Sequence, residues 1–308
     1  MLRTLLLELA KRPDLGRWIT SYSVTRRIAR RFVPGEELDQ ALEAARLTNA
    51  ARMSVSLDEL GENVSSREDA ERARDTYTNI LDRIAAERLD ANISLKLTHL
   101  GLDLSEEFCE AQLRAVTERA AALRNFVRVD MEGSAYTERT LRIVKEVRAE
   151  TDAVGTVIQA YLYRSRQDVE DLLEAGCRIR LVKGAYKEPP EAALQRKRDV
   201  DANFVSLTRL LLSSGLYHAI ATHDPKMIDA AIRYATRHSI AKDKFEFQML
   251  YGVRTDLQRR LVRDGYRFRV YIPYGKDWFP YFMRRLAERP ANLLFLLKNL
   301  FRGSNASE

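Results

Sequence analysis

The feature that most constrains the fold is a regular alternation of short apolar runs with longer charged segments, which begins near residue 50. The runs are rich in valine, isoleucine, leucine and phenylalanine, and such runs are typical of buried strands. The segments between them, for example 67–88 and 106–123, carry apolar residues at helical spacing. This order predicts an α/β fold with a parallel sheet. We expect strands at 52–57, 93–97, 126–131, 156–160, 179–182, 219–222, 245–249 and 268–272.

Eight strands that alternate with helices over about 240 residues are the pattern of a (β/α)8 barrel, and an open doubly wound sheet is the alternative. We expect an N-terminal helical segment at 1–47, the barrel at 48–290, and a C-terminal helix and tail at 291–308. No two of the 13 glycines are separated by a single residue, so the Rossmann and Walker glycine motifs are absent. A nucleotide cofactor would have to be held by other means.

The composition is that of an ordinary globular protein, with a net charge of +7. The surplus arginines are scattered among glutamates, which indicates solvated helix faces and no nucleic-acid-binding surface. Cys109 and Cys177 are too few for a disulfide framework, and the four histidines have no metal-ligand spacing, so we expect no metal. No apolar run approaches the roughly 18 residues of a membrane span. We therefore expect a cytoplasmic protein, at most peripheral to a membrane.

Polar side chains follow the carboxyl ends of nearly all the predicted strands. In a (β/α)8 barrel this rim carries the chemistry. Any one of these residues has an ordinary explanation, such as a helix cap or a hydrogen-bonded core histidine, but together they predict a polar pocket. Its cations suit a small carboxylate or the phosphates of a cofactor. The residues are Lys96, Asp130, Glu132, Gln159, Arg180, Lys183, His223, Gln248 and Tyr271.

The last predicted helix, within 277–288, is unusual because it carries a polar stripe along an apolar helix. Asp277 is a plausible N-cap, and Pro280 is tolerated in the first turn. Adjacent arginines repel each other, so they are most favourable where an anion meets them. The alternative is a solvated face with Arg–Glu pairs. The stripe consists of Tyr281, Arg284, Arg285 and Glu288, at spacing i, i+3, i+4 and i+7.

Four strings in this order resemble the proline dehydrogenase family: RIRLVKGAY at 178–186, ATHDP at 221–225, FEFQMLYG at 245–252, and RVYIPYG followed by YFMRRLAE within 269–288. The resemblance implies a (β/α)8 barrel with FAD at the strand carboxyl ends and the last barrel helix over the barrel mouth. It also implies oxidation of L-proline to 1-pyrroline-5-carboxylate, with hydride transfer from proline C5 to flavin N5 and a membrane quinone as electron acceptor.

The resemblance also implies roles for individual residues. Arg284, Arg285 and Lys96 match residues that bind the proline carboxylate. Tyr271 and Tyr281 match aromatic residues around the substrate ring, and Glu288 matches a carboxylate near the amine. Asp130 and Tyr186 match residues that orient this shell, and Leu250 matches an apolar wall. Arg180 matches the arginine near flavin N5, so Arg180, Asp130 and Tyr271 are the expected catalytic residues. The expected FAD-binding positions are Gln159, Arg180, Lys183, Gly184, Ala185, Thr222 and His223.

Two other readings of the chain remain open. One is a flavin-free lyase or aldolase in which Lys96 or Lys183 forms a Schiff base, and the other is a basic nucleic-acid-binding module. For membrane contact, the candidates are the basic segment 26–31 and the apolar helix 293–301, which could equally pack against the barrel. The chain has no room for a fused aldehyde dehydrogenase, so we expect a separate 1-pyrroline-5-carboxylate dehydrogenase to take the product.

Overall fold

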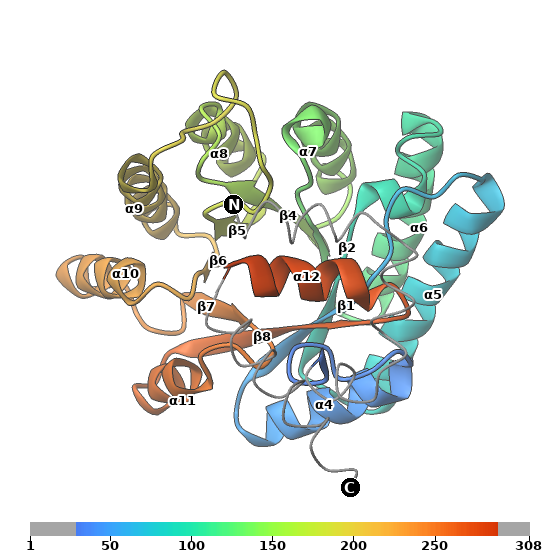
Figure 1. Cartoon of the computed structure of the whole chain (residues 1–308), viewed down its shortest axis with the longest axis horizontal. Coiled ribbons are helices and arrows are strands. Elements are labelled where there is room, and N and C mark those ends of the chain that lie inside the picture. Colours follow the sequence, from blue (N-terminus) through green and yellow to red (C-terminus); the bar gives the residue numbers. More distant parts are fainter. Residues whose placement is uncertain (1–28, 289–308) are drawn as a thin grey trace, which may run out of the picture.

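Eight parallel strands form a closed barrel in which β1 pairs with β8, as seen along the barrel in Figure 1. The computed structural model describes residues 29–288, except the side chains of residues 284 and 286–288. The closure confirms the predicted (β/α)8 barrel and excludes the open sheet. The strands are β1 (Ser54–Glu59), β2 (Ala91–Leu95), β3 (Val127–Val129), β4 (Val154–Gln159), β5 (Arg178–Val182), β6 (His218–Ala221), β7 (Phe245–Leu250) and β8 (Arg267–Tyr274).

Helices surround the barrel, and each predicted apolar run lies on a strand with its ends within two residues of the observed ones (Figure 1). Segments 1–28 and 289–308 lie outside the described residues, so the predicted C-terminal helix and the domain limits stay predictions. The helices are α4 (Leu38–Ala50), α5 (Arg67–Ala86), the 3₁₀ helix η1 (Leu97–Leu100), α6 (Glu106–Ala122), α7 (Ser134–Arg148), α8 (Ser165–Glu174), α9 (Lys197–Ser213), α10 (Pro225–Arg237), α11 (Thr255–Arg263) and α12 (Trp278–Glu288).

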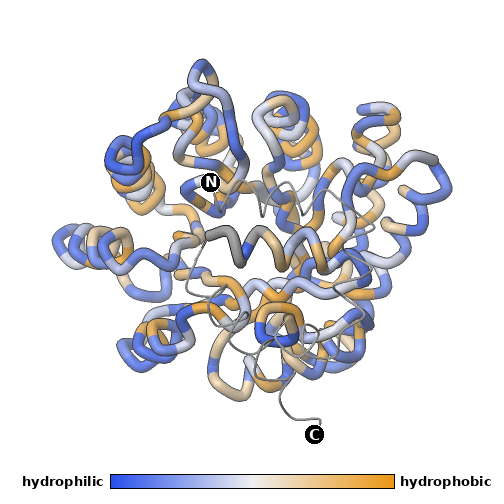
Figure 2. The backbone as a smooth tube through the Cα atoms, in the orientation of Figure 1, coloured by the Kyte–Doolittle hydropathy of each residue, from blue (hydrophilic) through white to orange (hydrophobic). Residues whose placement is uncertain are grey.

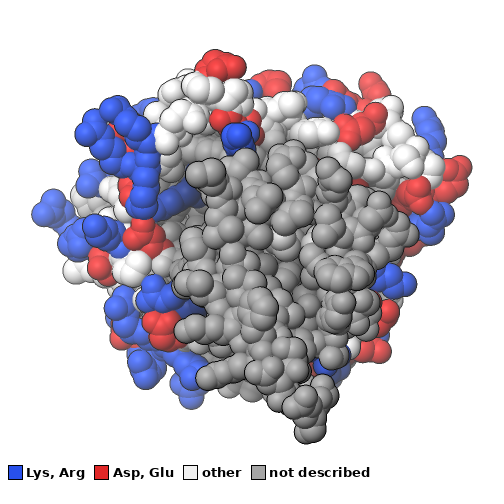
Figure 3. All heavy atoms as spheres, viewed as in Figure 1, with Lys and Arg blue, Asp and Glu red and all other residues white. Residues whose placement is uncertain are grey.

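The main apolar core lies between the strands and the helices. Leu57 and Ile93 on the strands are fully buried with Leu81 of α5 and Leu113 of α6. Figure 2 shows the apolar sides of the helices turned toward the barrel and the polar sides turned outward. Figure 3 shows acidic and basic side chains interspersed around the visible described surface, with basic ones numerous beside α9 and α10. The apolar side of each helix therefore places that helix against the outside of the barrel.

The barrel interior, in contrast, is polar. Arg269 pairs with buried Glu246 at 2.9 Å. Arg128 donates to the carbonyl oxygen of Thr156 at 3.0 Å and lies over the Phe126 ring. Burial, together with the charge of nearby Arg180, lowers the pKa of Arg128 to about 9. The interior thus carries charge that must be balanced inside the protein.

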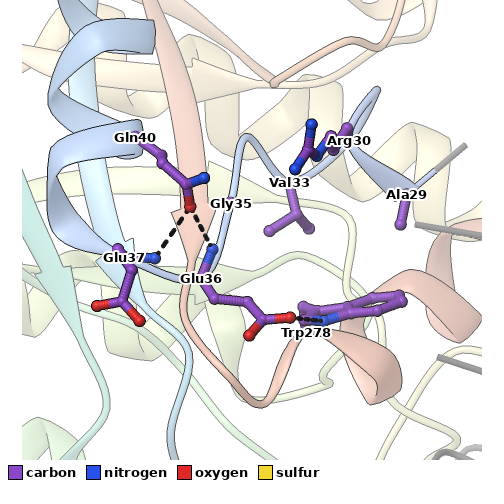
Figure 4. A pocket seen from close by; sticks show the side chains of 8 residues that line it. All are labelled: Ala29, Arg30, Val33, Gly35, Glu36, Glu37, Gln40 and Trp278. Atoms are coloured by element: carbon purple, nitrogen blue, oxygen red, sulfur yellow. Dashed lines mark hydrogen bonds between the residues drawn. The ribbon is translucent and has the colours of Figure 1, made fainter. Parts of the chain in front are cut away.

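Helix α12 crosses the barrel mouth instead of lying beside the barrel (Figure 1). It begins at Trp278, directly after the predicted N-cap Asp277. Its apolar side packs on the segment before α4, where the rings of Phe32 and Phe282 are 6.2 Å apart. Trp278 also donates a hydrogen bond of 3.1 Å to Glu36, beside a cavity of about 240 Å³ (Figure 4). The residues before α4 therefore hold α12 in place over the mouth.

Gly155 offers a direct test of the packing inside the barrel. A Cβ there would lie 2.3 Å from the carbonyl oxygen of Arg178 and 2.7 Å from the Phe126 ring. We expect Gly155→Ala to lower the free energy of unfolding by about 1–3 kcal/mol or more, because the rigid strand cannot yield. Gly133→Ala is the control, since its nearest neighbour would be 3.6 Å away. Urea denaturation measures both, and equal stabilities would contradict the packing.

Candidate active site

A cavity of about 500 Å³ opens at the carboxyl ends of the strands, where the sequence predicted a polar pocket. It is bounded on one side by α12, through Tyr281 and Arg285. The side chains of Arg284 and Glu288 lie outside the described residues. Of the other residues predicted for the pocket, all except Glu132 line this cavity: Lys96, Asp130, Gln159, Arg180, Lys183, Gly184, Ala185, Tyr186, Thr222, His223, Gln248, Leu250, Tyr271, Tyr281 and Arg285.

Arg180 is the centre of the polar network on the cavity floor. Its guanidinium donates to Asp130 Oδ1 at 2.6 Å and to the hydroxyls of Ser56 and Ser94 at 3.2 and 3.0 Å. It also lies over the Tyr271 ring, 5.2 Å from the ring centre, and the Tyr271 hydroxyl donates to Asp130 Oδ2 at 2.8 Å. Because three strands other than its own fix Arg180, its position is rigid. Sequence reasoning did not find Ser56 and Ser94, which are small residues inside strands.

Lys96 borders the cavity next to a carboxylate that the sequence analysis missed, Asp58. The Lys96 ammonium lies 3.8 Å from Asp58 Oδ1, and both residues are buried. Burial raises the pKa of Asp58 to about 6, although the charge of Lys96 opposes this shift. Asp58 directly follows the first predicted strand, so it could have been found had the survey of strand ends started there and not at the second strand.

Glu132, expected at the rim, turns away from the cavity. Its carboxylate accepts hydrogen bonds from the Thr98 hydroxyl at 2.8 Å and from the Thr98 backbone N–H at 3.3 Å. Its own carbonyl oxygen accepts from Gln159 at 2.9 Å. Glu132 thus links the loop after β3 to Thr98 in η1 and to Gln159 at the end of β4.

The segment after β5 lines another wall of the cavity. Lys183 is paired with Asp201 at 2.6 Å and with Asp224 at 2.7 Å. Gly184 has φ +119°, and a Cβ there would lie 2.5 Å from the Tyr161 ring. Only glycine therefore lets this backbone pass along the cavity. The two aspartates come from the start of α9 and α10, so no sequence spacing could have paired them with Lys183.

His223 lies between two strands of the same wall. Its Nε2 accepts the backbone N–H of Leu250 at 3.0 Å. A ring nitrogen that accepts must be deprotonated, so the neutral imidazole carries its proton on Nδ1. His223 therefore joins the loop after β6 to the end of β7.

These contacts disfavour a Schiff-base enzyme. A nucleophilic lysine must be neutral. Burial lowers the pKa of Lys96, but Asp58 and then Asp130 more than offset this, so its pKa is raised above its usual value. Lys183 is held between two carboxylates. Both lysines are therefore placed as cations.

Comparisons with known proteins settle the family. The family model described as proline dehydrogenase matches residues 41–298. The chain belongs to the proline dehydrogenase family. Proline dehydrogenase 1 of Bacillus subtilis (strain 168) is 42% identical over 302 residues, which are 98% of this chain and 100% of that protein. Proline dehydrogenase of Deinococcus radiodurans is 38% identical over 281 residues, 90% of this chain and 91% of that protein.

Solved structures agree on the proline dehydrogenase fold. The chain superposes with a TM-score of 0.81 on proline utilization A (PutA) from Bdellovibrio bacteriovorus inactivated by N-propargylglycine, at 29% identity over 92% of this chain. It spans 34% of that longer chain. The predictions of an oxidoreductase of proline metabolism and of its barrel fold are thus confirmed.

Two further observations concern residues 29–288. Within this range no helix is long and apolar enough to span a membrane. Among the side chains that the structure describes, no three His, Cys, Asp or Glu side chains are grouped so that they could hold a metal ion. Cys109 and Cys177 are both buried.

The buried Glu132 makes the stability dependent on pH. Burial raises its pKa from 4.5 to about 7. Between these values the folded state binds more protons than the unfolded state, so this contribution to stability falls as the pH rises. We expect Glu132→Gln to gain about 2–3 kcal/mol relative to wild type between about pH 5 and pH 8.

Urea denaturation at a series of pH values measures this difference. Glu118→Gln, at an exposed position of α6, is the control and should keep the wild-type pH dependence. A difference between Glu132→Gln and wild type that stays constant with pH would contradict the account of Glu132.

Proposed function

We propose that the protein binds FAD and oxidises L-proline to 1-pyrroline-5-carboxylate, by hydride transfer from C5 of proline to N5 of the flavin. The observation that carries this proposal is the cationic cavity at the barrel mouth of a proline dehydrogenase family member. Lys96, Arg180, Lys183 and Arg285 all line it. A site with this charge favours a substrate carboxylate and cofactor phosphates.

The residues of the wall after β5 fit a dinucleotide. Lys183 offers an ammonium, and the backbone of Gly184 and Ala185 lines the cavity beside it. Proposed FAD contacts are Gln159, Arg180, Lys183, Gly184, Ala185, Thr222 and His223. FAD, when bound, would supply the acceptor for the hydride.

The opposite side of the cavity fits proline. Arg285 lies over the Tyr281 ring at 5.0 Å, and both border the cavity from α12. We assign Arg285, Arg284 and Lys96 to the carboxylate, Tyr271 and Tyr281 to the ring, and Glu288 to the amine. Tyr186 and Leu250 complete the wall.

These residues can promote the reaction in two ways. Hydride transfer needs a neutral amine, and the nearby cations lower the pKa of the bound amine. The carboxylate clamp holds C5 in one orientation, which removes the entropic cost of alignment. Arg180, held by Asp130 and Tyr271, offers a fixed positive charge where negative charge develops.

Arg285→Met tests the clamp. We expect KM for proline to rise roughly 10- to 100-fold, because a hydrogen-bonded charge pair is lost. The bound flavin, measured by its visible absorption, should be unchanged. Arg259→Met, at an exposed position of α11, is the matched control. Wild-type kinetics in Arg285→Met, measured with a dye as electron acceptor, would remove Arg285 from the substrate site.

We further propose a membrane quinone as the electron acceptor and a separate 1-pyrroline-5-carboxylate dehydrogenase as the consumer of the product. Of the candidate membrane segments, 293–301 and most of 26–31 lie outside the described residues. The full chain should float with anionic vesicles, whereas a chain that ends at Glu288 should float less. Identical flotation of the two would remove the C-terminal segment from this role.

A further inference from the structure

Asp58 is a buried carboxylate that nothing in the described part of the chain hydrogen-bonds. It lies on β1, in register with Ser94 of β2 and Pro273 of β8, and is 1% exposed. Neither carboxylate oxygen has a partner in hydrogen-bond geometry among the described residues, and the nearby Tyr271 hydroxyl donates its one proton to Asp130. Buried carboxylates normally gather several donors, because desolvation is costly. An exception next to a ligand cavity calls for a functional reason.

Asp130, the other carboxylate on the cavity floor, is fully engaged. It accepts hydrogen bonds from Arg180 and from the Tyr271 hydroxyl. Asp58 instead faces Lys96, and it is the one carboxylate within 4 Å of the ammonium among the side chains that the structure describes. Asp58 is therefore the carboxylate nearest to Lys96, and Asp130, which is hydrogen-bonded to other groups, acts on Lys96 from farther away.

The Asp58–Lys96 distance matters for what Lys96 can do. At 3.8 Å the contact is an ion pair but is too long for a hydrogen bond. Asp58 therefore balances the charge of Lys96 without occupying its N–H donors. Lys96 borders the cavity, so these donors can serve a ligand there.

We propose that Asp58 is a positioning residue, which keeps the buried Lys96 charged at the cavity wall and so sets the affinity of the site for the substrate carboxylate. The inference rests on the proposed function, in which Lys96 binds that carboxylate. Without Asp58, burial is opposed by Asp130 and smaller contributions alone, so the neutral amine, which attracts an anion far less, gains population as the pH rises.

Several other titratable groups face Lys96. They stay in place in all the variants below, so a difference between variants isolates Asp58. They are Asp130, Glu62 and Tyr186, and also Glu132 and His99, whose own titration senses the charge of Lys96.

The test is the affinity of the holoenzyme for cyclopentanecarboxylate, which keeps the carboxylate of proline and lacks the amine. Calorimetric titration between about pH 8 and 9.5, above the raised pKa values of Asp58 and Glu132, gives the Kd. Wild type should bind with a constant Kd there, because Lys96 stays charged. In Asp58→Asn the affinity should fall about tenfold per pH unit above the lowered pKa of Lys96.

Three variants complete the design. Asp58→Asn combined with Lys96→Arg should restore a Kd that does not change with pH, because a guanidinium does not lose its proton. Lys96→Met should bind weakly at all pH values, and adding Asp58→Asn to it should introduce no pH dependence. Asp75→Asn, at an exposed position of α5, is the control and should match wild type.

A Kd of Asp58→Asn that is constant with pH would overturn the proposal. If Lys96→Met also binds like wild type, the assumed contact between Lys96 and the carboxylate fails as well. If Lys96→Met is weak, only the role of Asp58 fails. Should Asp58→Asn not fold, Asp58→Glu keeps the charge and should give a constant Kd, and a loss of affinity with rising pH in that variant would contradict the proposal.

Discussion

The ion pair between Arg180 and Asp130 is the interaction on which the geometry of the site depends. It joins β5 to the end of β3 across the barrel, and hydroxyls on β1 and β2 bind the same guanidinium. Removing one partner of a buried pair typically costs about 3–5 kcal/mol, because the other charge is left without compensation. The closed barrel is therefore part of the site, because the register of its strands places Asp130 and the two hydroxyls within hydrogen-bond distance of Arg180.

The pairing of the other charged side chains at the cavity follows from the ion pair between Arg180 and Asp130. Asp130 is occupied by Arg180 and Tyr271, so Lys96 needs a different carboxylate, and Asp58 lies at the required place. Lys183 on the other wall has its own pair of aspartates. Each cation at the cavity floor and walls is thus fixed before any ligand enters, which lowers the cost of binding an anion. Helix α12 adds a second set of groups from above, held by the segment before α4.

The barrel could be predicted from the sequence because its parallel strands are buried on both faces and therefore appear in the sequence as apolar runs. It also placed the polar residues at the right rim, since a strand end is a local feature. It could not give partners that depend on folding. Asp201 and Asp224 join Lys183 from different helices. Trp278 and Glu36 are 242 residues apart in the chain. Asp58 directly follows the first predicted strand and could have been included on that ground, but its pairing with Lys96, which follows the neighbouring strand, appears only in the fold.

The central claim is that the cationic barrel mouth holds proline against a bound flavin. Anaerobic mixing of the purified protein with L-proline, followed by the visible flavin absorption, tests it most directly. The account predicts that the flavin band bleaches at a rate that saturates with proline, and that one equivalent of 1-pyrroline-5-carboxylate forms for each flavin. A protein that carries no flavin, or a flavin that stays oxidised in the presence of L-proline, would contradict it.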